Sequence, residues 1–149
     1  MCPENPIGTV DLYLTSHHGL ERSGSPQLVH ALRPRVAVMN NGTRKGGAPD
    51  AFRVLYESPG LEDLWQLHWS HNVGLDNAPA LFVANVDDNP TVAGVLVPPP
   101  GEPGGRGRGR GAAATHDPAY LIRVSARADG SFTVTNTRNG FSKSYGARP

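Results

Sequence analysis

The chain has 149 residues and a formal net charge of +1, with 14 lysines and arginines against 13 aspartates and glutamates. This balance gives no global reason to expect nucleic acid or a membrane surface as a partner. The length fits a single domain, and no apolar run reaches the ~18 residues of a membrane-spanning helix. The first residues also lack the basic and then apolar layout of a secretory signal, so the cytoplasm is the default expectation for its location.

The first seventy residues predict alternating strands and helices. Ser25 is a suitable N-cap, Pro26 fits the first helical position, and Pro34 ends the helix that they begin. Apolar periodicity and turn residues give the expected elements in chain order: a strand over Val10–Ser16, the helix from Pro26, a buried strand over Val36–Met39, a helix over Pro49–Glu57 and a strand over Leu64–Trp69. This order favours an α/β fold in which neighbouring strands are parallel.

The pattern changes after residue 70. Leu81–Val86 fits either a strand or a short helix, and residues 97–118 form a low-complexity loop of Pro, Gly and Arg within the same domain. Its arginines have no interleaved aromatic residues, so the loop is not expected to bind nucleic acid. An antiparallel meander is then predicted over Tyr120–Ala126, Ser131–Thr135 and Phe141–Tyr145, with hairpin turns at Asp129-Gly130 and Asn139-Gly140.

Two adjacent histidines, His17 and His18, come at the end of the first strand and precede Gly19. Neutral imidazole is a natural zinc ligand, and a catalytic zinc usually takes three protein ligands and one water. One reading is therefore that one histidine of the pair binds a metal. The other reading is a loop histidine pair without a metal. A second pair, His68 and His71, has the same two readings, and His30 is expected at the surface.

The loop after the second strand begins with Asn40 and Asn41. Active-site loops often follow the carboxyl ends of strands in open α/β sheets, and amide side chains can both donate and accept hydrogen bonds there. Arg44 and Lys45 place positive charge in the same loop, where an anion can bind. The alternative is a connecting loop made of ordinary turn-forming residues.

The run Gly8–Leu20, in which a strand ends in His-His-Gly, resembles the last metal-binding segment of metallo-β-lactamase-fold hydrolases. The branch it resembles is related to the hydrolase domain of competence DNA-uptake (ComEC-like) proteins. The same resemblance continues through the rest of the chain, apart from the low-complexity loop, over Ser23–Pro26, Leu28–Pro34, Val36–Gly47, Leu61–His68 and Gly130–Lys143.

The resemblance implies one half of a four-layered αββα sandwich, whose zinc site lies at the sheet edges between two similar halves. The first half of such hydrolases carries His-x-His-x-Asp-His, which this sequence lacks, and only the final histidine position is matched, by His17 or His18. The 149 residues are therefore expected to be a single incomplete domain, the C-terminal portion of a longer hydrolase. Because the match begins directly after Met1, a truncated gene model is favoured over a genuine short protein.

Two functional readings remain open. In the first, the intact parent is a zinc-dependent hydrolase of a small-molecule, phosphodiester or ester substrate, and it can be exported. His17 or His18 then binds the metal, Asn40, Asn41 and Lys45 are substrate-side candidates, and the chain alone binds zinc weakly and is inactive. In the second, it is a non-catalytic interaction module. A missing half would expose one sheet face and favour self-association through its apolar residues, Leu12, Leu14, Val36, Val38, Trp65 and Leu67.

Overall fold

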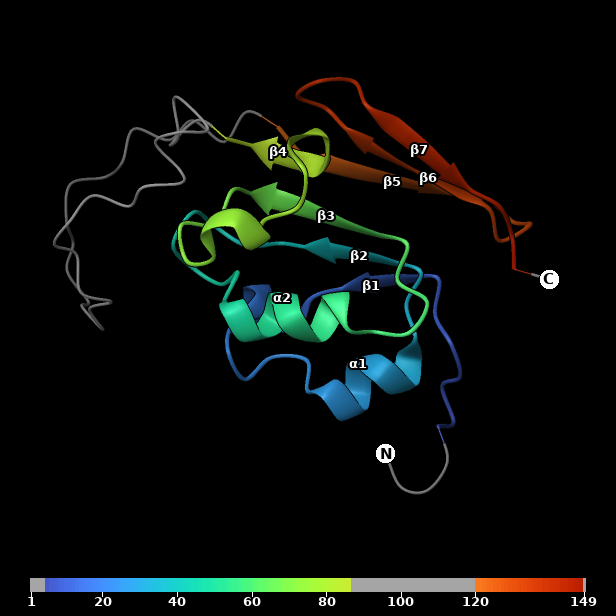
Figure 1. The fold of residues 1–149 in the computed structure, drawn as a ribbon. Helices are drawn as coiled ribbons and strands as arrows, with labels where there is room; N and C mark the ends of the chain where they lie inside the picture. The colour runs from blue at the N-terminus through green and yellow to red at the C-terminus, as the bar shows by residue number, and fades with distance from the viewer. Residues whose placement is uncertain (1–4, 87–119, 149) are drawn as a thin grey trace, which may run out of the picture.

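A four-stranded parallel sheet forms the centre of the fold in the computed structural model, which describes residues 5–86 and 120–148. In chain order its elements are β1 (Leu12–Leu14), α1 (Pro26–Leu32), β2 (Val36–Met39), α2 (Pro49–Tyr56), β3 (Asp63–His68) and β4 (Val83–Asn85). The strands lie in the order β1-β2-β3-β4, and each is parallel to the next (Figure 1). The predicted α/β alternation is therefore confirmed.

Short 3-10 helices account for two differences from the sequence-based boundaries. The first strand is shorter than expected, because soon after β1 the chain turns into a short segment, η1 (Ser16–Gly19), in which His17 and His18 have non-helical, left-handed backbone angles. Leu81–Val86 contains both of its predicted alternatives, since η3 (Ala80–Phe82) leads directly into β4. A third 3-10 turn, η2 (Gly74–Asp76), lies between β3 and η3.

The C-terminal residues form a separate three-stranded antiparallel sheet, as predicted. Its strands are β5 (Ile122–Ala126), β6 (Phe132–Asn136) and β7 (Ser142–Tyr145), with β6 in the middle. Gly130 and Gly140 have φ of +85° and +72° in the two hairpin turns, a conformation that glycine adopts without a Cβ clash. The low-complexity loop predicted at 97–118 lies outside the described residues.

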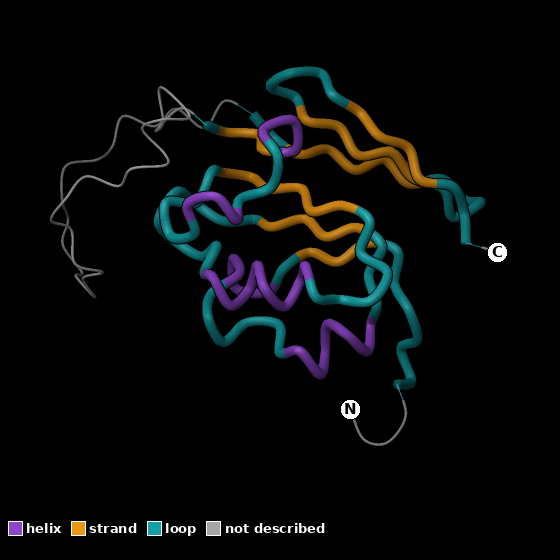
Figure 2. Tube along the Cα trace, viewed as in Figure 1, coloured by secondary structure: helices purple, strands orange, loops and turns teal. Residues whose placement is uncertain are grey.

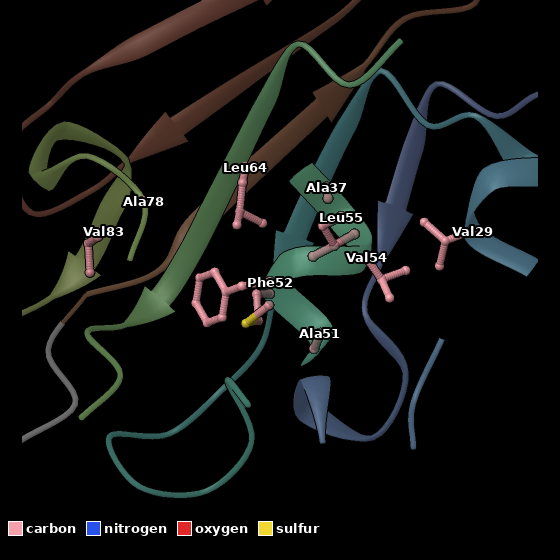
Figure 3. Packing of buried hydrophobic residues seen from close by; sticks show 10 residues of the cluster. Val29, Ala37, Ala51, Phe52, Val54, Leu55, Leu64, Ala78 and Val83 are labelled. Atoms are coloured by element: carbon pink, nitrogen blue, oxygen red, sulfur yellow. The ribbon is translucent and has the colours of Figure 1, made fainter. Parts of the chain in front are cut away.

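The elements stack in three layers: helices, parallel sheet and antiparallel sheet (Figures 1 and 2). The helix-side core consists of residues from both helices, from β2, β3 and β4, and from the segment before η3 (Figure 3): Val29, Ala37, Met39, Ala51, Phe52, Val54, Leu55, Leu64, Ala78 and Val83. His30 also joins the two helices. It was expected at the surface, but it is half-buried and its Nε2 lies 3.0 Å from the carbonyl oxygen of Val54.

The second core lies between the two sheets and corrects the expected exposed face. Val36, Val38 and Trp65 are only 0%, 8% and 0% exposed, because they pack against Phe132, Val134 and Tyr145 of the antiparallel sheet. The chain's own C-terminal meander thus covers this face over β2 and β3. Leu67 is half-buried.

The edge strand β1 keeps exposed apolar side chains on that same face. Leu12 pairs with Val36 and Leu14 with Val38 in the parallel register, so the two leucines share the face that the meander covers elsewhere. They are nevertheless 36% and 58% exposed. The exposed apolar face expected from the sequence is therefore reduced to a strip along β1, formed by Leu12 and Leu14.

The alternation of β3 also ends earlier than its sequence suggests. Leu64 faces the helices and Trp65 faces the meander, as expected from a period of two. The strand predicted over Leu64–Trp69 would place Trp69 on the Trp65 face, but Trp69 packs against the helix-side core. The reason is that β3 stops at His68, so the alternation does not continue to Trp69.

Asparagine side chains attach the meander to the parallel sheet. Asn136 is fully buried, and its Nδ2 donates to the carbonyl oxygens of Leu81 and Val83, both at 2.9 Å. Asn85 binds Tyr120 twice: its Nδ2 donates to the Tyr120 carbonyl at 2.9 Å, and its Oδ1 accepts from the Tyr120 N–H at 3.3 Å. Residues 85 and 120 are therefore held side by side.

The amino ends of the strands carry paired charges. Asp63 accepts hydrogen bonds from Lys143 and from the Tyr145 hydroxyl, the latter at 2.6 Å, and Trp65 Nε1 donates to the same hydroxyl at 3.1 Å. Burial, and then the hydrogen bond to Asp63, raise the pKa of Tyr145 well above its usual range. This cluster links β3 to β7, which are far apart in sequence.

No helix within the described ranges is both long enough and apolar enough to cross a membrane.

Candidate metal and substrate site at the carboxyl edge of the parallel sheet

Three loops meet where β1, β2 and β3 end, because the carboxyl ends of parallel strands lie at one edge of a sheet. The loop after β1 contains His17 and His18, and the loop after β2 spans residues 40–47. The two loops are bonded directly: the Gly47 N–H donates to the His18 carbonyl and the Ala48 N–H to the Gly19 carbonyl, both at 2.9 Å. All five predicted site residues therefore lie at the same edge.

The histidine pair has a left-handed backbone. His17 and His18 have φ of 48° and 62°, and Gly19 follows with φ of 70°. A left-handed conformation costs a non-glycine residue about 1–2 kcal/mol, so two in succession require strong local support. Such strain is concentrated at functional sites, where surrounding contacts hold it in place.

One hydrogen bond fixes the ring of His18. Its Nδ1 lies 2.9 Å from the carbonyl oxygen of Asn40, which can only accept, so Nδ1 carries the proton. The lone pair then lies on Nε2, and this is the arrangement that usually supports a metal-binding histidine. The His17 ring is exposed, with its centroid 6.3 Å from that of His18 and its plane tilted by 45°.

The structure gives the three substrate-side candidates different environments. Asn41 is 1% exposed, and its Nδ2 donates to the carbonyls of His68 and Gly42 at 2.8 and 2.9 Å, so it positions the loop rather than facing solvent. Asn40 is half-buried and its Oδ1 accepts from the hydroxyl of Thr15 at 3.1 Å. Lys45 is exposed.

A network of neutral side chains, buried at Gln66, Ser70 and Asn77, supports these loops. Gln66 is fully buried, and its Nε2 donates to the His68 carbonyl at 2.7 Å and to Asn77 Oδ1 at 2.6 Å. Ser70 Oγ donates to the Gly47 carbonyl at 2.9 Å, and Asn72 Nδ2 donates to the Gly46 carbonyl at 2.8 Å. Sequence reasoning missed these residues, and Gln66 alone has a sequence signal, as a polar side chain inside an otherwise apolar strand.

Gly46 and Gly47 allow the loops to approach each other. A Cβ added at Gly46 would lie 1.9 Å from the His18 carbonyl oxygen, far inside contact distance. A Cβ at Gly47 would lie 2.8 Å from Ser70 Oγ. Both glycines also have positive φ, of 74° and 55°, so two independent constraints select glycine at each position.

A pocket of about 580 Å³ opens beside the histidine pair. Its lining residues are His17, Leu20, Glu21, Arg22, Ser23, Arg44, Gly46, Ala48, Pro49 and Asn72. His17 and Arg44 were predicted at this edge, whereas Arg22 was not singled out, because a lone arginine in a loop carries no sequence signal. The volume lies within the range of small-molecule sites.

Comparison with known proteins finds no matching family model, no matching curated protein and no matching solved structure. Within residues 5–86 and 120–148, no group of three or more His, Cys, Asp or Glu side chains is placed to hold a metal ion. The second predicted pair lies beside this edge, with His68 buried at the end of β3 and the His71 N–H donating to the Thr43 carbonyl at 2.9 Å.

Proposed function

We propose that this chain is the C-terminal portion of a zinc-dependent hydrolase of the metallo-β-lactamase superfamily, with its metal and substrate at the carboxyl edge of the parallel sheet. The observation that carries the proposal is the hydrogen bond from His18 Nδ1 to the Asn40 carbonyl, which leaves Nε2 as a lone-pair donor. The resemblance of Gly8–Leu20 to a metal-binding segment supports the same assignment. The layer of helices on a parallel sheet fits one half of an αββα sandwich.

The residues of this chain fit one corner of a zinc site. His18 would contribute Nε2, and the Asn40 carbonyl would hold its ring in place. A bound zinc ion supplies Lewis acidity and a water of lowered pKa for hydrolysis. His17 lies on the wall of the adjacent pocket, where it can contact substrate. The remaining ligands would come from a His-x-His-x-Asp-His segment, which the chain lacks.

The test is a zinc titration of the purified chain followed by NMR of the histidine rings. We expect binding weaker than about 1 μM, with the His18 resonances shifting first, since one or two donors fall short of a full zinc shell. His30→Gln is the matched control, because His30 is held by a carbonyl but lies between the helices. Shifts that leave His18 unchanged would contradict the metal assignment. One-to-one binding tighter than about 1 μM would show a complete local site and contradict the fragment proposal.

A second candidate function is a non-catalytic interaction module. It is favoured by the closed core between the sheets, where Trp65 is fully buried against residues of the chain's own meander. Such a module would fold without a second half and bind a partner along β1, where Leu14 is exposed.

Light scattering and binding of a hydrophobic dye separate the two candidates. A monodisperse monomer that binds neither dye nor zinc supports the module. An associating chain whose association is reduced by Leu14→Lys supports a fragment that lacks its neighbour, since the change places a charge on the exposed strip. Leu75→Lys is the matched control, because Leu75 is 77% exposed but lies on η2 and not on β1.

A further inference from the structure

Two arginines on the wall of the pocket lack an acidic partner among the residues that the structure describes. Among the described residues, neither Arg22 nor Arg44 forms an ion pair, and both are exposed. They come from different loops, one after β1 and one after β2, yet they line the same pocket. Lys45 adds a further exposed cation in the second loop.

The other wall residues narrow the chemistry of a ligand. Glu21 is the only carboxylate in the described lining, so the two arginines give this wall an excess of positive charge. Leu20, Ala48 and Pro49 supply apolar surface, and Asn72 holds the Gly46 carbonyl across the loop. At about 580 Å³ the pocket is much larger than an inorganic anion needs.

We propose that this pocket binds a phosphorylated small molecule that also carries hydroxyl groups, with Arg22 and Arg44 on the phosphate and Glu21 accepting from a hydroxyl. Guanidinium groups match phosphate oxygens through paired N–H donors, and two of them suit the double charge of a phosphate monoester. A bare anion would be disfavoured by Glu21, and a neutral sugar would leave both arginines without a partner. The inference names the substrate class of the proposed hydrolase site, and to that extent it rests on the proposed function.

The test measures binding of ribose 5-phosphate to the full chain by calorimetry, in EDTA so that no metal takes part. Inorganic phosphate and ribose are the two comparison ligands. We expect ribose 5-phosphate to bind more tightly than either, and rising salt to weaken it because the arginines are exposed. Arg22→Ala and Arg44→Ala should each weaken binding about tenfold, the size of one lost charge-assisted hydrogen bond.

Two further variants test whether ribose 5-phosphate binds at this pocket. Arg123→Ala removes an exposed arginine from the meander, away from the pocket lining, and should leave binding unchanged. Glu21→Gln should reduce the preference for ribose 5-phosphate over inorganic phosphate, because it removes the charge that opposes the bare anion. Equal affinity of both arginine variants and the unaltered chain, or binding of inorganic phosphate as tight as that of the sugar phosphate, would overturn the inference.

The two proposals fail separately. Arginine-dependent binding in EDTA, together with zinc shifts that leave His18 unchanged, would keep the pocket and reject the hydrolase. Zinc shifts at His18 without arginine-dependent binding would do the reverse.

Discussion

The two ends of the parallel sheet use polar residues in opposite ways. At the amino end the charges are paired: Asp11 contacts Arg35 at 3.6 Å and Arg148 at 2.9 Å, and Arg35 also binds Glu62 at 2.7 Å. At the carboxyl end the buried polar side chains apart from His68 are amides and hydroxyls, such as Asn41 and its buried neighbours in the loop network. Cations there remain exposed on the pocket wall.

This difference separates a structural edge from the edge at which we propose binding. Charges that pair within the chain, as Asp63 does with Lys143, link β3 to β7. A neutral network can fix loop geometry without neutralising nearby cations. The carboxyl edge therefore holds its loops with neutral hydrogen bonds and leaves Arg22 and Arg44 exposed.

The largest effect on the carboxyl edge is expected at Gly46. We expect Gly46→Ala to destabilise the protein by about 3 kcal/mol or more. The new Cβ would overlap the His18 carbonyl oxygen, and alanine would have to adopt a left-handed φ. The control is Gly140→Ala, which has φ of +72° but nothing within 4 Å of the added Cβ, and which should cost only about 1 kcal/mol. Urea denaturation measures both, and equal losses would show that backbone conformation alone selects glycine.

The amino edge is tested by Tyr145→Phe. Removing the hydroxyl leaves Trp65 Nε1 and one Asp63 interaction without their partner, so we expect a loss of about 1–3 kcal/mol in the free energy of unfolding. Tyr56→Phe is the control, since Tyr56 is 48% exposed and its hydroxyl makes one hydrogen bond, to the Asp76 carbonyl at 3.1 Å. A larger loss at Tyr56 than at Tyr145 would contradict the ranking.

Stability should also fall in alkaline solution. The folded state holds the proton of Tyr145 to a higher pH than the unfolded chain, whose tyrosine pKa is about 10. Above that pH the unfolded state binds fewer protons, so the contribution of Tyr145 is complete below pH 10 and declines as the pH rises further. Urea denaturation at pH 8, 9, 10 and 11 should show this decline, and Tyr145→Phe should reduce its slope. An unchanged slope would reject the linkage.

The smallest expected effects concern the histidine pair. His18→Ala should cost about 1 kcal/mol, the net value of its hydrogen bond to the Asn40 carbonyl, whereas His17→Ala should change stability by less than about 0.5 kcal/mol because its ring is exposed. Thermal unfolding measured by circular dichroism compares the two. A larger loss of stability for His17→Ala than for His18→Ala would contradict the structural role assigned to His18.

Local signals in the sequence predicted most of the fold. Ser25 caps α1 through a hydrogen bond from the Leu28 N–H at 3.3 Å, as its position before Pro26 indicated. Gly130 and Gly140 mark the two hairpin turns of the meander. In each case the determining residues lie within a few positions of one another, so the sequence contains the whole signal.

The contacts that were not predicted join distant residues. Tyr145 and Asp63 are 82 positions apart, and only the packing of the two sheets brings them together. Asn41 was a substrate-side candidate, and its side chain is buried and donates to the carbonyl of His68, on the neighbouring strand. Arg22 lies in the loop that follows the left-handed turn at His17 and lines the same pocket as Arg44, from the next loop. Sequence position alone indicates none of these relations.

The two hydrogen bonds between Asn85 and Tyr120 bear on where a further segment can be inserted into the protein. Because the two residues are held together by their own hydrogen bonds, the chain enters and leaves the segment between them at one fixed place. A tag or a second domain inserted between positions 85 and 120 should therefore leave these two ends of the described fold held together.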